Sequence, residues 1–218
     1  MDSLPSRGRL HAWLQLLRLA NTPTAVADVL AGALVAAGFQ VDPGRLLAAG
    51  LASVAFYSGG CVLNDLVDQG EDAQLRPERP LPSGRVRSSQ ARLAAGALLG
   101  LGLAACALAG LTSLAAGLAL AGLIVLYDLG VKDHPLLGPA AMASCRAMNA
   151  VLGLSLGWPT GVAWLLPLLL GWHVAALTVL SRHEIGGAAG RLPAAVGTVW
   201  LGLIALLAGL AAAGLLAA

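Results

Sequence analysis

The sequence predicts an all-α membrane protein, a polytopic bundle of about seven transmembrane helices. Hydrophobic residues make up 58% of the 218 residues and charged residues only 11%, whereas a soluble domain has about 25% charged residues. The apolar residues form uniform runs of Leu, Ala, Gly and Val, which suit membrane helices better than the alternating strands of a barrel. The 28 glycines fit the same class, because small residues let membrane helices approach closely. We expect residues 1–218 to form a single transmembrane domain.

Seven apolar runs define the expected spans, each near the ~20 residues that a helix needs to cross the hydrocarbon core. In chain order they are Leu16–Gly38, Leu46–Val67, Ala91–Gly110, Ser113–Leu129, Leu137–Gly157, Val162–Leu180 and Ala194–Leu216. The Gln69–Gln90 loop contains RPERPLPSGR, whose prolines and glycine favour turns over a helix. The first residues are polar and carry arginine, which is not typical of a removable signal peptide.

The basic residues predict the orientation of the bundle. With the N-terminus in the cytoplasm, every Lys and Arg except Arg45 and Arg146 lies on or beside the cytoplasmic side, as the positive-inside rule requires. The loop after the second span, the Tyr127–Lys132 stretch and the Arg182–Arg191 stretch then face the cytoplasm together. We expect a multi-pass protein of the cell inner membrane, surrounded by membrane lipid, with a cytoplasmic site and no nucleic-acid partner.

Asn64, Asp68 and Asp72 recur every fourth residue in NDLVDQGED, where the second span ends. Steps of four residues keep side chains on one face of an α-helix. With Asp65 and Glu71 nearby, this concentration of negative charge indicates a bound cation. Carboxylate oxygens suit Mg²⁺, which typically binds through one or two carboxylates plus substrate phosphates. The pattern predicts a magnesium-held phosphorylated substrate at the membrane surface; the alternative is a solvated helix end with ordinary interfacial acids.

Several polar residues lie within the predicted spans. Asp28 falls inside the first span, and Arg146 and Asn149 lie three apart in the fifth, hence on one helix face. Charged groups inside a membrane are costly and usually face a cavity or a partner. We expect Asp28 and Arg146 either to pair or to act separately around a substrate. Asn21, near the start of the first span, is a weaker candidate for the same pocket.

The Asn64–Asp72 column followed by RPERPLPSG resembles the first signature of the UbiA superfamily of intramembrane prenyltransferases. The segments LRLANTPTAVADVLAG, Tyr127–Lys132 and CRAMNAVLG resemble the same group, most closely the branch encoded in bacterial Ebo-type gene clusters. The resemblance implies a helical bundle, usually of nine helices, that binds a polyprenyl diphosphate through Mg²⁺. Such proteins transfer the prenyl group to a lipophilic, often aromatic, acceptor in the membrane.

The resemblance also implies roles for individual residues. Asn64, Asp68 and Asp72 match the magnesium–diphosphate ligands, and Arg76 and Arg79 fall where the family places basic residues near the diphosphate. Arginine suits that place because its planar fork binds phosphate oxygens in pairs. The expected catalytic residues are Asp68, Asp72 and Lys132, and the expected substrate-binding residues are Asn64, Arg76, Arg79, Tyr127, Arg146, Asn149, Asn21 and Asp28. For Tyr127 and Lys132 an ordinary interfacial aromatic and a topology-setting lysine remain an equal alternative.

The chain departs from the family pattern in two ways. Most members carry a second Asp-rich signature between the later helices, where this chain has SRHEIGGAAGR. Glu184 is the only acid there, flanked by Arg182 and His183, and is the remaining candidate for a second magnesium ligand. The second departure is the count of seven spans against the usual nine, which we interpret as an absent helix pair or a shortened product. An open bundle of that kind would require a homo-oligomer or a partner subunit.

Two other functions remain open from the sequence. A non-catalytic membrane subunit that binds or transports lipid or prenyl groups would explain the degenerate second signature. A CDP-alcohol phosphotransferase would also place acids four residues apart at a membrane boundary. Those enzymes carry a D-G-x-x-A-R stretch upstream, and none precedes Asn64 here.

Overall fold

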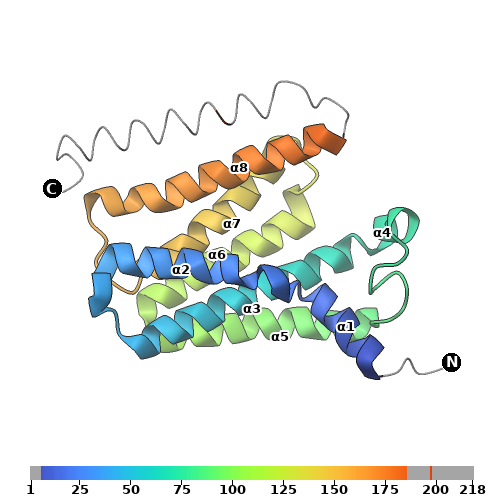
Figure 1. Ribbon diagram of the computed structural model, residues 1–218, viewed down its shortest axis with the longest axis horizontal. Helices are drawn as coiled ribbons and strands as arrows, with labels where there is room; N and C mark the ends of the chain where they lie inside the picture. The colour runs from blue at the N-terminus through green and yellow to red at the C-terminus, as the bar shows by residue number, and fades with distance from the viewer. Residues whose placement is uncertain (1–5, 186–196, 198–218) are drawn as a thin grey trace.

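The computed structural model describes residues 6–185 and 197, and this part of the chain is helical with no strand. Figure 1 shows the long helices running side by side along the molecule, with α1 and α4 at one end. The α-helices are α1 (Ser6–Leu16), α2 (Thr22–Ala37), α3 (Pro43–Val67), α4 (Gln69–Leu75), α5 (Ser88–Ala109), α6 (Leu111–Leu126), α7 (Leu137–Leu154) and α8 (Leu165–Ile185). The short segments are the 3-10 turns η1 (Leu19–Asn21), η2 (Gly38–Gln40) and η4 (Gly161–Trp164) and the π-helical η3 (Tyr127–Val131).

The predicted all-α membrane bundle is confirmed. Five segments are long and apolar enough to cross a membrane: Leu19–Gln40, Pro43–Val67, Ser88–Ala109, Leu111–Val131 and Gly161–Ser181. They correspond to the first four and the sixth of the expected spans. The fifth, Leu137–Gly157, contains helix α7 but falls short of the same hydropathy, since Arg146 and Asn149 lie in it. The seventh, Ala194–Leu216, lies outside the described residues apart from Gly197.

The first span begins at Leu19 and not at Leu16 as predicted, because the chain bends at Arg18. Arg18 adopts the left-handed conformation (φ 48°, ψ 41°) and separates α1 from η1 and α2. On the inner side of α1, Ala12 and Leu16 are fully buried. They form a cluster with Leu81 and Val86 of the arginine-rich loop, residues 76–87, which connects α4 to α5. Helix α1 therefore packs against this loop and does not extend the first span.

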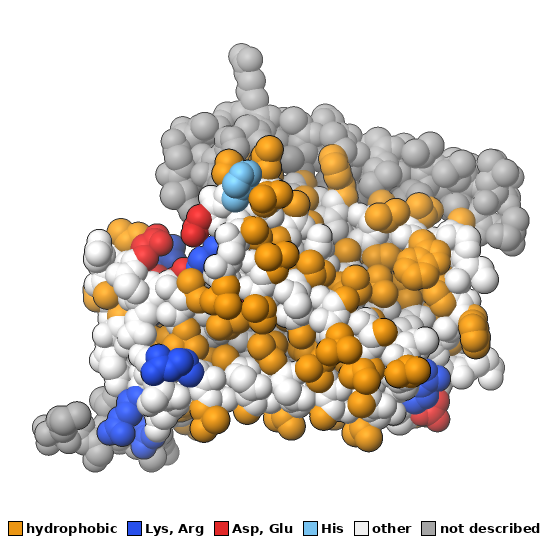
Figure 2. Space-filling view, turned by 180° about the vertical axis from the view of Figure 1, so that it is seen from behind, with side chains coloured by type: hydrophobic (Ala, Val, Ile, Leu, Met, Phe, Trp, Pro, Cys, Tyr) orange, Lys and Arg blue, Asp and Glu red, His pale blue; other side chains and the backbone are white. Residues whose placement is uncertain are grey.

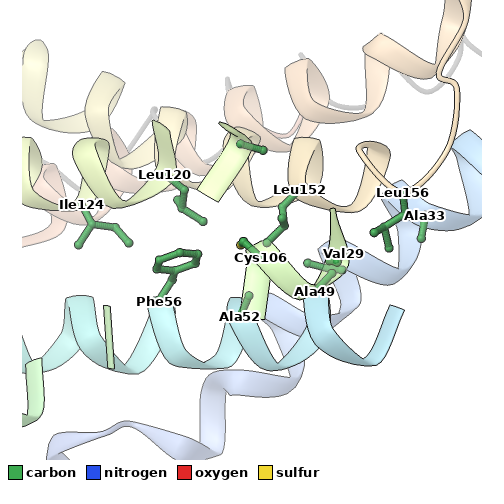
Figure 3. Packing of buried hydrophobic residues seen from close by; sticks show 12 residues of the cluster. Val29, Ala33, Ala49, Ala52, Phe56, Cys106, Leu120, Ile124, Leu152 and Leu156 are labelled. Carbon is green, nitrogen blue, oxygen red and sulfur yellow. The ribbon is translucent and has the colours of Figure 1, made fainter. Parts of the chain in front are cut away.

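The central core surrounds Phe56 of α3, as Figure 3 shows. Its ring lies beside Leu120 and Ile124 of α6 and near Cys106 of α5. Gly102 of α5 makes room for the ring, because a Cβ atom at this position would lie 2.7 Å from it. Glycine therefore allows α3 and α5 to pack closely around an aromatic side chain.

Helices α2 and α7 approach each other through glycines. A Cβ atom on Gly153 would lie 2.2 Å from the carbonyl oxygen of Val29, and one on Gly32 would lie 2.4 Å from that of Ala150. Both contacts are with backbone, which cannot move aside as a side chain can. Small residues at both surfaces thus fix the distance between α2 and α7.

The surface is apolar along its middle and charged towards its ends. Figure 2 shows hydrophobic side chains over the middle of one face, with charged groups gathered at the two ends. At one end Asp42 caps α3 by accepting a hydrogen bond from the Arg45 amide (2.8 Å), and the Arg45 side chain binds the Ala109 carbonyl (2.6 Å). The opposite end holds α4, the arginine-rich loop and the ends of α6 and α8 (Figure 1). This second end carries the polar residues that the sequence singles out.

Candidate functional site

The Asn64–Asp72 segment is bent at Asp68, and it is not the single straight helix that the four-residue spacing predicts. Helix α3 ends at Val67, Asp68 has φ −81° and ψ 0°, and α4 starts at Gln69. Helical hydrogen bonds nevertheless continue through the bend, from the Asp68 amide to the Asn64 carbonyl (2.9 Å) and from the Asp72 amide to the Asp68 carbonyl (2.8 Å). The three side chains remain one turn apart, but each has a different partner.

The Tyr127–Lys132 stretch meets this segment through a π-helical turn. In η3 the Lys132 amide donates to the Tyr127 carbonyl (3.0 Å), five residues back. Asp128 is buried there and accepts a hydrogen bond from the Asn64 side chain (3.1 Å), while the Lys132 ammonium group pairs with Asp68. π turns are frequent at functional sites, and this one joins the two segments at one end of the bundle. We call the group of polar side chains gathered there the mouth; it comprises Asn64, Asp65, Asp68, Asp72, Asp128 and Lys132 with the arginines that contact them.

Arginines neutralise the remaining carboxylates of the mouth. Arg79 Nη1 lies 2.6 Å from Asp72 Oδ2 and 3.6 Å from Asp65 Oδ1. Arg18 Nη2 lies 2.7 Å from the same Asp65 oxygen. Arg76 is more exposed and lies 3.8 Å from Asp72. Asp65 and Asp72 are almost fully buried. Because little water reaches their carboxylates, the arginine ion pairs balance the negative charge.

These ion pairs show which cations balance the negative charge of the mouth. In the part of the chain that the structure describes, no three His, Cys, Asp or Glu side chains are grouped closely enough to hold a metal by themselves. Three of the acids that suggested a bound cation, Asp65, Asp68 and Asp72, are instead paired with protein cations. Their oxygen donors still fit Mg²⁺, which needs only one or two carboxylates when substrate phosphates complete its shell.

Next to the mouth lies a largely apolar cavity of about 260 Å³ inside the bundle. Phe56, Leu120 and Ile124 contribute apolar surface, and Asn64 and Asp128 line it as well as belonging to the mouth. The other lining residues are Arg18, Ala25, Ser53, Tyr57, Gly60, Cys61, Tyr127, Met142, Cys145, Arg146, Asn149 and Val174. The cavity therefore combines a charged entrance with an apolar interior.

A buried polar network forms the deeper wall of this cavity. Arg146 Nε lies 2.7 Å from Asp28 Oδ2, so the structure pairs these two expected residues. The Asn149 amide group donates to the Ala25 carbonyl (2.8 Å) and to Asp28 (3.3 Å), and its oxygen accepts from the Ser53 hydroxyl (2.8 Å). Asn149 thereby connects α7 with α2 and α3, while Asp28 holds Arg146 without lining the cavity itself.

Comparison with known proteins assigns the chain to a family. Residues 25–218 match the UbiA prenyltransferase family. The chain belongs to that family. The digeranylgeranylglyceryl phosphate synthase of Methanopyrus kandleri is 33% identical over 160 residues, which cover 72% of this chain and 57% of that protein. The synthase of the same name from Ignicoccus hospitalis is 34% identical over 190 residues, which cover 84% of this chain and 60% of that protein. The chain thus spans less than two thirds of the length of these UbiA relatives.

Solved structures agree with the UbiA fold. A structure of digeranylgeranylglyceryl phosphate synthase in membranes matches with a TM-score of 0.75 at 23% identity, covering 83% of this chain and 65% of that one. A UbiA homolog from Archaeoglobus fulgidus bound to GPP and Mg²⁺ matches with a TM-score of 0.69 at 21% identity, covering 82% and 66%. At these identities the likeness establishes a shared fold. The two synthases from Methanopyrus and Ignicoccus bear the name of a glyceryl phosphate synthase and not that of an Ebo-type protein.

The structure brings most of the predicted UbiA site residues to the mouth or the cavity, with three exceptions. Asp28 holds Arg146 but does not line the cavity. Asn21 is exposed and does not line the cavity, although its side chain contacts Tyr57, which does. Glu184 falls in the last turn of α8, and its side chain lies outside the described residues, as do those of Arg182 and His183. The expected second metal ligand is therefore untested.

Sequence reasoning assigned no role to Asp128 and only a general one to Asp65 and Arg18. Asp128 directly follows Tyr127 and precedes Lys132 by four residues, so its position in this UbiA segment was a usable signal. Asp65 and Arg18 lie 47 residues apart and meet only in the folded bundle. Local spacing carries no information about such a contact.

Proposed function

We propose that this protein transfers a prenyl group from an allylic polyprenyl diphosphate to a lipophilic acceptor in the membrane. The observation that carries the proposal is the junction of an apolar cavity with a mouth rich in paired acidic and basic side chains. A diphosphate needs charged partners, and a prenyl chain needs apolar walls. Asn64 and Asp128 belong to both regions, so a substrate lying across them would have each half in a suitable environment.

The donor diphosphate would exchange partners with the ion pairs of the mouth. Lys132 and Arg79 now neutralise Asp68 and Asp72, and both cations are suited to phosphate oxygens. Asp68 and Asp72, with the Asn64 amide, would hold Mg²⁺ between protein and diphosphate. The metal would stabilise the negative charge that develops on the leaving diphosphate. Lys132 and Arg79 would add fixed positive charge on the other side of that leaving group.

The cavity would protect the reacting carbon from water. Departure of the diphosphate leaves positive charge on the allylic carbon, which water would capture in an open site. Phe56, Leu120 and Ile124 line the cavity with apolar surface, and such closed sites prevent competing reactions. The Asp28–Arg146–Asn149 network would keep the deep wall rigid, since each member has a fixed partner.

The curated relatives favour an acceptor that carries a phosphate. Their name, digeranylgeranylglyceryl phosphate synthase, describes a glyceryl phosphate with two geranylgeranyl groups. For this chain we infer an acceptor of that class, a glyceryl phosphate lipid with a free hydroxyl. The hydroxyl oxygen would bond to C1 of the prenyl group as the C1–O bond to diphosphate breaks. The electron pair leaves with the diphosphate, which also takes the hydroxyl proton.

An aromatic acceptor and an Ebo-type role stay predictions from the sequence. A CDP-alcohol phosphotransferase is disfavoured by the match to the UbiA family over residues 25–218. The location in the cell inner membrane, with the mouth facing the cytoplasm, belongs to the same proposal and rests on the arginines of the loop after α4.

The experiment that tests this function measures the binding of a non-hydrolysable geranylgeranyl diphosphate analogue to the purified protein, with and without Mg²⁺. We expect binding that requires the metal and that falls by about ten- to hundredfold in Asp68→Asn, because hydrogen bonds and contacts to charged groups are worth about 1.5–3 kcal/mol. Asp133→Asn is the matched control. It removes an exposed carboxylate of the same region that pairs with no cation among the described residues, and we expect unchanged binding.

Two results would contradict the proposal in different ways. Equal binding by wild type and Asp68→Asn would remove Asp68 from the site. Absence of analogue binding in the folded wild-type protein would favour a non-catalytic membrane subunit that binds lipid.

A further inference from the structure

Arg18 stands out by its backbone conformation. It is the only non-glycine residue with a positive φ in the part of the chain that the structure describes. L-residues with a side chain rarely adopt this conformation, and strained positions of this kind gather at binding and catalytic sites when the surroundings hold them in place. Here the strain occurs where α1 turns into η1 and α2, so the bend and the placement of the Arg18 side chain are coupled.

Arg18 also lies between two cavities. It lines the apolar cavity within the bundle, and it lines a polar cavity of about 360 Å³ at the mouth. Around the polar cavity, Arg79 and Arg85 contribute two further guanidinium groups, while Asp65 and Glu78 are the acids. Among the described residues, Arg18 alone is common to both linings. An anion bound in the polar cavity would therefore lie beside the apolar cavity, with Arg18 at the boundary.

The guanidinium groups at this boundary have donors to spare. Arg18 Nη2 and Arg79 Nη1 converge on one oxygen of Asp65, at 2.7 and 3.6 Å. Each guanidinium has five N–H groups, and within the described residues the Arg18 side chain donates a hydrogen bond to Asp65 alone. The Arg18 side chain is 36% exposed, whereas that of Asp65 is 7% exposed. The buried carboxylate thus holds one edge of Arg18 and leaves the rest of the group open to the cavities.

Arg85 has a different part in this arrangement. Its three nitrogens bind the Ser83 hydroxyl (3.1 Å), the Gln15 side chain (3.1 Å) and the Glu78 carbonyl. Through these bonds Arg85 ties the loop to α1 and forms part of the wall of the polar cavity. Of the two other arginines, Arg79 is bound to two carboxylates and is already assigned to the donor, whereas Arg18 is bound to one carboxylate and lines both cavities.

We propose that Arg18 binds the phosphate headgroup of the lipid acceptor in the polar cavity, beside the apolar cavity in which the prenyl group of the donor lies. This inference rests on the proposed function and adds a site to it. A planar guanidinium recognises phosphate through paired hydrogen bonds, which supports a specificity for phosphate-bearing over neutral acceptors. Arg18 is then a substrate-binding residue for the acceptor and has no contact with the donor diphosphate.

The test compares the binding of geranylgeranylglyceryl phosphate with that of its dephosphorylated alcohol by the full-length protein in detergent, without donor. We expect wild type to bind the phosphate form at least about tenfold more tightly, and Arg18→Asn to lose about ten- to hundredfold in affinity for this form alone. Asparagine removes the charge but tolerates the left-handed backbone, and Asp65 retains Arg79 as its partner. Arg18→Lys keeps the charge without the fork and should give an intermediate preference.

Two controls decide the interpretation. Arg18→Asn should still bind the diphosphate analogue with Mg²⁺ as wild type does, which also shows that the variant is folded. Millimolar inorganic phosphate should fail to displace the lipid, because the tail contributes to binding. Loss of analogue binding in Arg18→Asn would assign Arg18 to the donor and overturn the inference, and effective displacement by inorganic phosphate would overturn the lipid assignment.

The inference would also be overturned if wild type bound the phosphate lipid and its alcohol with equal affinity, or if the preference for the phosphate lipid survived in Arg18→Asn. The readout is independent of transfer activity. If wild type shows the phosphate preference but does not bind the donor analogue, the proposed transferase function fails while the anion site stands.

Discussion

Two serines on α3 give opposite predictions about buried hydroxyl groups. Ser53 and Ser58 are 1% and 2% exposed. The Ser53 hydroxyl donates to Asn149 at 2.8 Å, whereas the Ser58 hydroxyl oxygen has no hydrogen-bond partner within the described residues. Ser53→Ala should therefore destabilise the protein by about 1–2 kcal/mol, because it leaves the Asn149 oxygen unpaired in a buried site. Ser58→Ala should be neutral or slightly stabilising. Thermal unfolding in detergent measures both.

The two variants are matched controls for one another, because the same substitution is made on the same buried helix. An equal loss of stability in both would show that the Ser53–Asn149 hydrogen bond contributes nothing beyond packing. A loss only in Ser58→Ala would show that this hydroxyl has a partner, such as a water molecule, that stabilises it.

At the residue scale, functional side chains could be recognised from the sequence more readily than the residues that they contact in the fold. Asp28 and Arg146 were recognisable because a charged residue within a membrane span requires a partner, and the structure places them 2.7 Å apart. The partners of Asp68 and Asp72 were not recognisable in the same way. Lys132 and Arg79 seemed to be ligands for a diphosphate, yet in the structure they already neutralise these carboxylates. Pairing of that kind depends on which helix ends meet, and spacing along the chain does not record it.

Between elements, the contact of α2 with α7 depends on the absence of a side chain at Gly153. A Cβ atom there would lie 2.2 Å from the Val29 carbonyl oxygen. Gly153→Ala should force the helices apart and cost about 1–3 kcal/mol, as overpacking commonly does. Gly96→Ala in α5 is the control, since a Cβ atom there would meet nothing within 4 Å. It should be neutral or stabilising by up to about 1 kcal/mol through helix propensity.

Thermal unfolding of the two glycine variants side by side checks this contact. A Gly153→Ala protein as stable as Gly96→Ala would mean that α2 and α7 do not approach as closely as described. The same pair also bears on the site, because Asn149 and Arg146 reach Asp28 across this helix contact. A shift of α7 should therefore weaken the polar wall of the cavity together with the global stability.

Element boundaries were predictable where apolar runs end and not where the backbone bends inside a run. The second, third and fourth spans begin and end within a few residues of expectation. The break at Arg18 was missed because apolar residues continue on both sides of it, in LLRLA. The bend at Asp68 and the π turn at Tyr127 were missed for a related reason. Both keep helical hydrogen bonds, and tertiary contacts of the mouth favour them.

For the whole molecule, hydrophobic run length was enough to predict the fold class, because a bilayer leaves helices few alternatives. The exception is α7, whose polar residues face the cavity and lower its hydropathy at the place where function requires them. The same residues that weaken the membrane signal thus indicate the site. Charge at the two ends of the bundle, seen in Figure 2, completes this pattern.

The orientation of the bundle gives the last prediction. Single cysteines are introduced at Ser89, beside the arginine-rich loop, and at Thr160, between α7 and η4, after replacing Cys61, Cys106 and Cys145 with alanine. Both positions are exposed and lie at opposite ends of the bundle. Because arginines surround the first position and not the second, the positive-inside rule places Ser89 in the cytoplasm. A membrane-impermeant maleimide should label Thr160→Cys in intact spheroplasts, and Ser89→Cys only in inside-out vesicles. The reverse pattern would turn the mouth outward, away from cytoplasmic prenyl diphosphates, and would contradict the orientation on which the proposed donor entry depends.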